Sequence, residues 1–222
     1  GVNYRANIDV LKRSGVTDIL SLSAVGSLRE ALAPGTFVLV DQFIDRTIQR
    51  DQSFFGPGLV AHVSMAHPVC ARLGSALAVA ARSVDVTVVR GGTYLAMEGP
   101  HFSSLAESEL YRTWGCDVIG MTNMPEAKLA REAEICYATV AMVTDYDCWH
   151  PDHDYVQVAD IIRVLTANAD HVRALVRAAA LDLGNRPPVC PAGCDHALET
   201  AIITAPEARD PAIAAMLDAV AG

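Results

Sequence analysis

Residues 135–149 read ICYATVAMVTDYDCW, an apolar run that ends in two carboxylates among aromatic side chains. The run Ile135–Thr144 predicts a β-strand. Asp145 and Asp147 follow it two residues apart, so both side chains point to the same side at the end of the strand. Ligands of α/β proteins bind at strand ends. Paired acids there suit a planar nitrogenous ring, because one acid can donate a proton while both accept from N–H groups.

Outward from this strand, apolar strand-like runs alternate with segments of helical periodicity. Further strands are expected over Asp18–Val25, Thr36–Phe43, Val86–Tyr94 and Asp117–Met121. Helices are expected over Val2–Ser14, Pro68–Ser83, Ser103–Thr113, Pro125–Glu134, Val156–Leu183 and Asp210–Val220. Ser104 and Glu107 form a capping-box pattern at the start of one of these helices. The alternation predicts an α/β fold with a mixed central sheet and helices on both faces.

Length and composition indicate one domain over residues 1–222, because 51% hydrophobic residues suffice for one substantial core. The formal net charge of -9 repels a nucleic-acid backbone, so we expect no nucleic-acid partner. No apolar stretch reaches about 18 uncharged residues, and no membrane contact is expected. The polar start Gly1–Arg5 does not read as a signal peptide. We expect a cytoplasmic protein.

The cysteines and histidines offer few metal-binding patterns. Of six cysteines, four lie in apolar or helical contexts and are expected to be reduced core thiols. Cys190 and Cys194 have three residues between them and lack a second pair, so they predict neither a zinc ribbon nor a redox motif, although a local disulfide stays open. His62, His67 and the HPDHD segment at 150–154 could supply zinc ligands, but a third partner is not evident. We therefore expect no metal.

Two further strand ends could bind an anion. In Ser21–Glu30, backbone N–H groups could form an anion nest to which Ser23 adds a hydroxyl; an ordinary strand-to-helix turn is the alternative. In Met121–Glu126, Thr122 could bind an anion before a helix while Met121 packs on a sugar. Core filling by methionine and helix capping by Thr or Asn are the stronger explanation of that second segment taken alone.

The segment Thr93–Ser104 (TYLAMEGPHFSS) could contact a nucleoside. Glu98 can accept hydrogen bonds from ribose hydroxyls, and Phe102 can stack on a base. The alternative is a turn with a buried Phe followed by a helix cap.

Taken together, several stretches resemble the trimeric purine nucleoside phosphorylase family, most closely its 5'-methylthioadenosine phosphorylase branch. The stretches are VNYRANIDVLKRSG, SAVGSLREALAPG, VDQFIDRTIQR, YLAMEGPHFSSLAESELYRTWGCDVIGMTNMPEAKLAREAEICYA and VTDYDCW, all within Val2–Trp149. The branch is indicated by TDYDCW, because members that act on 6-oxopurines carry an Asn near this position. A carboxylate accepts from an adenine amino group, whereas it would oppose a purine carbonyl as a second acceptor.

The resemblance implies catalytic and phosphate-binding roles. Asp145 would hydrogen-bond purine N7 and supply its proton, and Asp147 would hold the exocyclic amine. Which acid carries the proton stays open, since close carboxylates titrate as a pair. Ser23, Thr122 and the Ala24 N–H would bind phosphate.

The resemblance also implies nucleoside contacts. Phe102 and Ser103 would contact the base. Met121 and Glu98 would contact the ribose, and Val158 and Ile161 the methylthio group. His62 would reach the 5' end of a ligand in a neighbouring subunit, because sites of the family lie at trimer interfaces. A homotrimer is expected, with a hexamer as the alternative.

The implied reaction is phosphorolysis of 5'-methylthioadenosine, with inorganic phosphate as co-substrate and no metal or organic cofactor. One departure is that the family's first strand, with its Gly-Gly-Ser/Thr-Gly turn, and its Arg-His-Gly segment have no counterpart here, although both bind phosphate. We therefore expect this sequence to be part of a longer protein. Two alternatives stay open: phosphorolysis of 6-oxopurine nucleosides, and a nucleoside-binding module with impaired catalysis.

Overall fold

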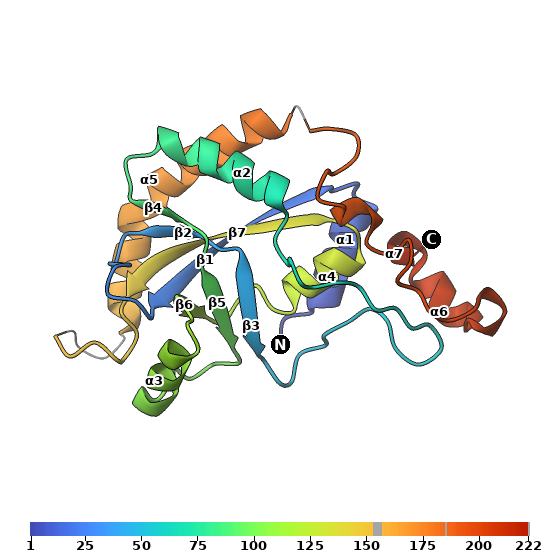
Figure 1. Cartoon of the computed structure of the whole chain (residues 1–222), viewed down its shortest axis with the longest axis horizontal. Coiled ribbons are helices and arrows are strands. Elements are labelled where there is room, and N and C mark those ends of the chain that lie inside the picture. Colours follow the sequence, from blue (N-terminus) through green and yellow to red (C-terminus); the bar gives the residue numbers. More distant parts are fainter. Residues whose placement is uncertain (153–156, 185, 222) are drawn as a thin grey trace.

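The computed structural model, which describes residues 1–152, 157–184 and 186–221, has a mixed seven-stranded sheet at its centre (Figure 1). The strands are β1 (Asp18–Ser27), β2 (Phe37–Leu39), β3 (Gln42–Arg46), β4 (Val88–Arg90), β5 (Thr93–Met97), β6 (Val118–Gly120) and β7 (Cys136–Asp145). Their order across the sheet is β3-β5-β6-β1-β7-β2-β4. The β1–β6 and β2–β7 pairs are antiparallel and the others parallel, so the predicted α/β fold with a mixed sheet is confirmed.

Helices cover both faces of this sheet (Figure 1). The α-helices are α1 (Tyr4–Arg13), α2 (Ala71–Ala80), α3 (Leu105–Thr113), α4 (Glu126–Glu132), α5 (Val158–Leu183), α6 (Pro211–Met216) and α7 (Asp218–Ala221). Short 3-10 turns occupy Ala81–Ser83, Cys194–His196 and Pro206–Ala208. The predicted capping box at the start of α3 is confirmed, with Ser104 and Glu107 bonding each other's backbone N–H.

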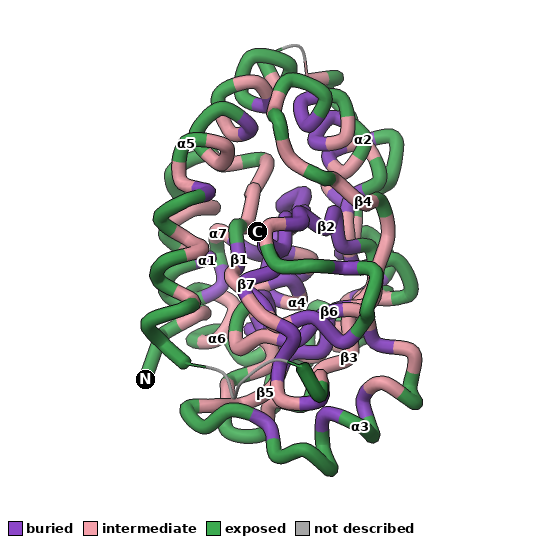
Figure 2. The backbone as a smooth tube through the Cα atoms, turned by 90° about the vertical axis from the view of Figure 1, so that its left-hand side faces the viewer, coloured by how far each residue is buried: buried purple, intermediate pink, exposed green. Residues whose placement is uncertain are grey.

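Strand β7 is the centre of the core. Its even-numbered residues, such as Ala138 and Val140, pack with α2 and α5, whereas odd-numbered ones, such as Ala141 and Val143, pack with α1 and α4. This alternation follows from the two-residue period of a strand, and here both faces are apolar because both are covered. Figure 2 shows the buried backbone concentrated on the strands, with exposed turns on the outer helices.

Two predicted strands are each broken in the middle. Thr36–Phe43 divides into β2 and β3, and Val86–Tyr94 divides into β4 and β5. At the break, Gly92 O accepts from the Asp41 N–H (3.2 Å), and Asp41 Oδ1 accepts from the Gly92 N–H (3.1 Å). The break lets the chain pass from one edge of the sheet, where β2 pairs with β4, to the other edge, where β3 pairs with β5.

The C-terminal segment also differs from its prediction. The single helix expected over Asp210–Val220 is two short helices, α6 and α7, interrupted at Leu217. Leu217 is buried and belongs to the same core cluster as Ile8 of α1, so the interruption turns an apolar side chain inward. Within the described parts of the chain, no helix is both long and apolar enough to cross a lipid bilayer.

Candidate active site

A cavity of about 160 Å³ lies at the carboxyl ends of β1 and β7, which run in parallel side by side. Its lining comes from β1, β5, β6, β7 and α5 and from the segments that follow the strands: Ala24, Val25, Gly26, Met97, Phe102, Ile119, Gly120, Met121, Thr122, Thr144, Asp145, Asp147 and Ile161. The carboxyl edge of strands is where open α/β sheets bind ligands. The structure thus gathers most of the predicted site residues in one place.

The two acids are held together by their own segment of chain. Asp145 Oδ1 accepts from the Asp147 N–H (2.8 Å), and Asp145 Oδ2 accepts from the Thr144 hydroxyl (2.7 Å). Asp147 has a left-handed backbone (φ 53°), which closes this turn. A Cβ on Gly26 would lie 3.0 Å from Asp145 Oδ1 and 3.2 Å from Asp147 Cβ, so glycine leaves room for the pair.

Burial shifts the titration of both acids. It raises the pKa of Asp147 to about 6, and the negative charge of Asp145 adds to the shift. Burial also raises the pKa of Asp145, although its bonds to Thr144 and the Asp147 N–H oppose the effect. A hydrogen bond from the Ser108 side chain opposes part of the shift at Asp147. Both acids line the cavity, so the pair is placed to meet a ligand.

Predicted anion-binding hydroxyls meet beside the acids. Ser23 Oγ and Thr122 Oγ1 are 2.6 Å apart, although β1 and the segment after β6 are distant in sequence. The Tyr94 hydroxyl lies 3.1 Å from each, and sequence reasoning missed this residue. A Cβ on Gly120 would come within 2.1 Å of the Tyr94 oxygen, so this glycine admits the hydroxyl. The glycine that ends β6 was the only local signal for the arrangement.

The remaining pocket residues divide into apolar walls and supports. Phe102 and Ile161 line the cavity, and Phe102 is half-exposed at its mouth. Met121 also lines it and packs against Gly99, where a Cβ would lie 2.7 Å from the sulfur. Ser103 is buried behind the cavity, with its hydroxyl 3.7 Å from the Met97 sulfur and its carbonyl oxygen 3.4 Å from the Cys148 sulfur.

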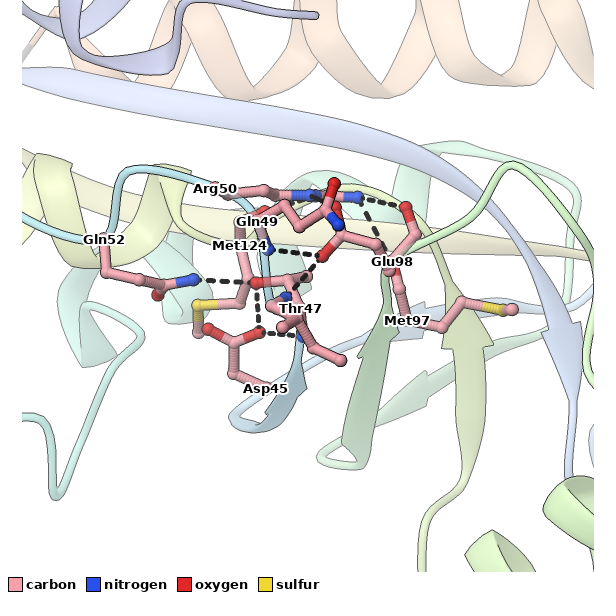
Figure 3. A network of polar contacts seen from close by, with 9 residues as sticks. Asp45, Thr47, Gln49, Arg50, Gln52, Met97, Glu98 and Met124 are labelled. Atoms are coloured by element: carbon pink, nitrogen blue, oxygen red, sulfur yellow. Dashed lines mark hydrogen bonds and ion pairs between the residues drawn. The ribbon is translucent and has the colours of Figure 1, made fainter.

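Glu98 does not line the cavity; its carboxylate binds a loop (Figure 3). Its Oε2 accepts from the backbone N–H groups of Ile48 and Gln49, and these bonds lower its pKa. Arg50 bonds Glu98 Oε1 (3.4 Å), the Glu98 carbonyl (2.8 Å) and the Met124 carbonyl (2.5 Å). The loop is thereby tied to the carboxyl end of β5, beside the cavity.

Two predicted contacts lie elsewhere in this chain. His62 lines a separate cavity of about 360 Å³ together with Ser53, Lys128 and Glu132. Val158 is 60% exposed at the start of α5 and does not line the site cavity. The HPDHD segment cannot be compared in full, because residues 153 and 154 lie outside the described residues.

The sequence matches the family described as Phosphorylase superfamily over residues 1–180. The chain belongs to this superfamily. An S-methyl-5'-thioadenosine phosphorylase of Bradyrhizobium diazoefficiens is 68% identical over 221 residues, which are 100% of this chain and 76% of the relative. One of Cereibacter sphaeroides is 65% identical over the same shares of the two chains.

Solved structures of the superfamily share the fold. A methylthioadenosine phosphorylase from an antarctic soil metagenomic library superposes with a TM-score of 0.91 at 47% identity, covering 99% of this chain and 77% of the other. The Schistosoma mansoni methylthioadenosine phosphorylase in complex with adenine gives 0.80 at 36% identity, covering 84% and 72%. The resemblance seen in the motifs is confirmed, and Asp145 and Asp147 of the TDYDCW motif line the cavity of this chain.

Proposed function

We propose that this phosphorylase-superfamily protein cleaves 5'-methylthioadenosine with phosphate, giving adenine and 5-methylthioribose 1-phosphate. The observation that carries the proposal is that Asp145 and Asp147 line one cavity together with Thr122, whose hydroxyl contacts those of Ser23 and Tyr94. The acids suit the purine, and the hydroxyls suit phosphate. High identity to S-methyl-5'-thioadenosine phosphorylases supports the same substrate.

The acid pair supplies the leaving-group proton. Adenine departs as an anion unless N7 is protonated as the glycosidic bond lengthens, so an acid there lowers the barrier. Asp145 donates to N7, and Asp147 accepts from the exocyclic amine, because both acids line the cavity. The raised pKa values of both groups let the pair hold a proton at higher pH than ordinary aspartates do. A 6-oxopurine would present a carbonyl to Asp147 and lose this bond.

The other residues position the two substrates. Thr122, Ser23 and the Ala24 N–H hold phosphate against the anomeric carbon, where positive charge develops as the bond breaks. Met121 packs on the ribose, Phe102 and Ser103 on the base, and Ile161 on the methylthio group. Glu98 is proposed to act indirectly, by holding the loop of residues 48–50 beside the cavity.

Quaternary structure completes the proposal. His62 lines a separate cavity of its own chain, and we propose that it contacts the ligand of a neighbouring subunit in a homotrimer. Val158, exposed at the start of α5, is proposed to wall the methylthio group once the oligomer forms. We also propose a role in purine and methionine salvage in the cytoplasm, with phosphate as co-substrate and no cofactor in the reaction; the high identity to S-methyl-5'-thioadenosine phosphorylases supports this role.

The direct test measures adenine release from 5'-methylthioadenosine with and without phosphate, using liquid chromatography to quantify adenine. We expect release that depends on phosphate, with one 5-methylthioribose 1-phosphate formed per adenine. Faster cleavage of methylthioinosine or inosine would overturn the adenine specificity. Binding of adenine in calorimetry without any cleavage would instead indicate a nucleoside-binding module. Sedimentation velocity tests the trimer on the same sample.

A further inference from the structure

Four cysteines from three distant parts of the chain meet at the amino end of β7. Cys136 begins that strand, Cys70 precedes α2, and Cys190 and Cys194 lie on the segment after α5. Their sulfur atoms all lie within 4.8 Å of one another, and all four residues are buried. Cys70 and Cys136 therefore form, in the folded chain, the second pair of cysteines that the sequence around Cys190 and Cys194 lacks.

The spacing of the sulfurs suits a single tetrahedral ion. With Zn–S bonds of about 2.3 Å, a tetrahedral site places its sulfurs about 3.8 Å apart. Cys70 Sγ and Cys190 Sγ are 3.6 Å apart, close to that edge length. The three-residue separation of Cys190 and Cys194 also falls within the spacing of paired zinc ligands. A cluster of several irons bridged by sulfide holds its cysteines farther apart than one ion does.

Backbone hydrogen bonds fix each of the three segments where its thiols meet. The Cys70 N–H donates to the Tyr137 carbonyl (2.9 Å), and the Cys136 N–H donates to the Thr17 carbonyl (3.0 Å). The Cys190 N–H donates to Asp195 Oδ2 (2.7 Å). Such hydrogen bonds hold the ligands in place before an ion binds. Less conformational entropy is then lost when the ion binds.

Two arginines bring positive charge to the cluster. Arg72 lies within hydrogen-bond reach of the Cys136 sulfur, and the positive charge of Arg131 lies near the Cys194 sulfur. The Arg72 side chain is largely buried and also forms an ion pair with Asp18, which pairs with Arg186 as well. Four thiolates around Zn²⁺ carry a net charge of about -2, which nearby cations stabilise.

We propose that Cys70, Cys136, Cys190 and Cys194 bind one Zn²⁺ ion as four thiolates, in a closed structural site. Binding would form four Zn–S bonds and release the four thiol protons to solvent. The ion would fasten residues 186–221 to the sheet, because two of its ligands belong to that segment and two to the core. It would lie at the opposite end of β7 from the acid pair and take no part in the proposed reaction.

The first experiment measures the metal content of the protein. The protein is expressed in zinc-supplemented medium and purified without a metal-affinity column. After extensive dialysis, elemental analysis by inductively coupled plasma mass spectrometry is expected to give about one zinc per chain. Replacing zinc with Co²⁺ is expected to give the intense visible bands and the near-ultraviolet charge-transfer band of tetrahedral cobalt thiolate. A chain without bound metal, or one that holds iron in place of zinc, would overturn the proposal.

Variants locate the ion. Cys194→Ser is expected to lose at least about tenfold in zinc content, because three thiolates leave the tetrahedral site open. Cys116→Ser is the matched control, since Cys116 is also buried and free but lies in another core cluster. Equal zinc in both variants would contradict the site. If Cys194→Ser does not fold, the cobalt spectrum of the unmodified chain decides.

Disulfides are the competing use of the same thiols. The chain is denatured without reductant, treated with iodoacetamide and a zinc chelator, and weighed. Under the proposal all six cysteines are alkylated. A mass that lacks four alkyl groups would show two disulfides among the four thiols and would overturn the zinc site.

Discussion

The two ends of β7 carry different chemistry on one buried strand. At the carboxyl end, Asp145 and Asp147 lie together because they are neighbours in sequence, and their environment opposes their charge. At the amino end, Cys136 meets three cysteines from distant segments, and cations lie beside them. Roughly 30 Å separates the ends of a ten-residue strand. At the carboxyl end, burial of two acids costs stability and raises their pKa values. At the amino end, the proposed binding of Zn²⁺ would add stability.

The largest expected effect is on the acid end. Asp145→Asn is expected to lower turnover of 5'-methylthioadenosine by about 10²–10⁴-fold, because a neutral amide cannot protonate N7. The KM for phosphate should stay within about twofold, since the hydroxyl cluster is unchanged. Steady-state kinetics measure both values. Asp182→Asn, on the exposed face of α5, is the control, and near-full turnover of the Asp145 variant would remove the acid role.

The second prediction is that an acid variant gains stability. Burial raises the folded-state pKa of Asp147 to about 6 from an ordinary value of 3.8, so the folded protein holds this proton more tightly than the unfolded chain does. The stabilising contribution is full below about pH 4 and is lost as pH rises through 6. Asp147→Asn, which stays neutral, is expected to gain about 1–3 kcal/mol at pH 7.

Urea unfolding at several pH values checks this prediction. The advantage of Asp147→Asn should grow between pH 4 and 6 and vanish below that range. A loss of stability that is independent of pH would show that the carboxylate is not under electrostatic stress. A cysteine variant at the other end of β7 should lose stability in the same assay, which sharpens the contrast between the two ends.

The third prediction concerns the space for the acids. Gly26→Ala would bring a methyl group to 3.0 Å from Asp145 Oδ1, which must move by a few tenths of an ångström. A displacement of 1 Å in a site can cost about 100-fold in rate, so we expect a loss of about tenfold in kcat. Gly74→Ala is the control, because a Cβ there contacts nothing within 4 Å. Equal kinetics in the two variants would show that the pair tolerates the methyl group.

The smallest effect is expected at the hydroxyl cluster. Tyr94→Phe removes the hydroxyl that lies 3.1 Å from both Ser23 Oγ and Thr122 Oγ1. The KM for phosphate should rise about three- to tenfold with little change in kcat, as expected for one or two neutral hydrogen bonds. Initial rates over a range of phosphate concentrations measure it. Tyr4→Phe, on α1, should leave both constants unchanged.

The sequence predicted what is local and missed what is brought together by folding. Asp145, Asp147 and their strand form one contiguous motif, and apolar periodicity indicated β7 and α5 correctly. The breaks at Asp41 and Gly92 depend on hydrogen bonds between segments about 50 residues apart, so neither run alone indicates them.

The same limit applies to the site. Tyr94 reads as an ordinary strand aromatic until Gly120 gives its hydroxyl access to Thr122. Glu98 lies in a motif that suggests a sugar contact, but its carboxylate binds the backbone of residues 48 and 49. A motif therefore specifies which groups are present, whereas the tertiary contacts decide which of their atoms stay available.

The ring of hydroxyls formed by Ser23, Thr122 and Tyr94 has a consequence for how the pocket responds to its ligand. Each hydroxyl can rotate its hydrogen about the C–O bond, so the three can satisfy one another or turn outward to an anion without moving a heavy atom. Under the proposed function, such a set would donate to a phosphate oxygen or accept from a ribose hydroxyl. Phosphate would then bind and leave by rotation of these hydroxyls, without movement of the backbone around them.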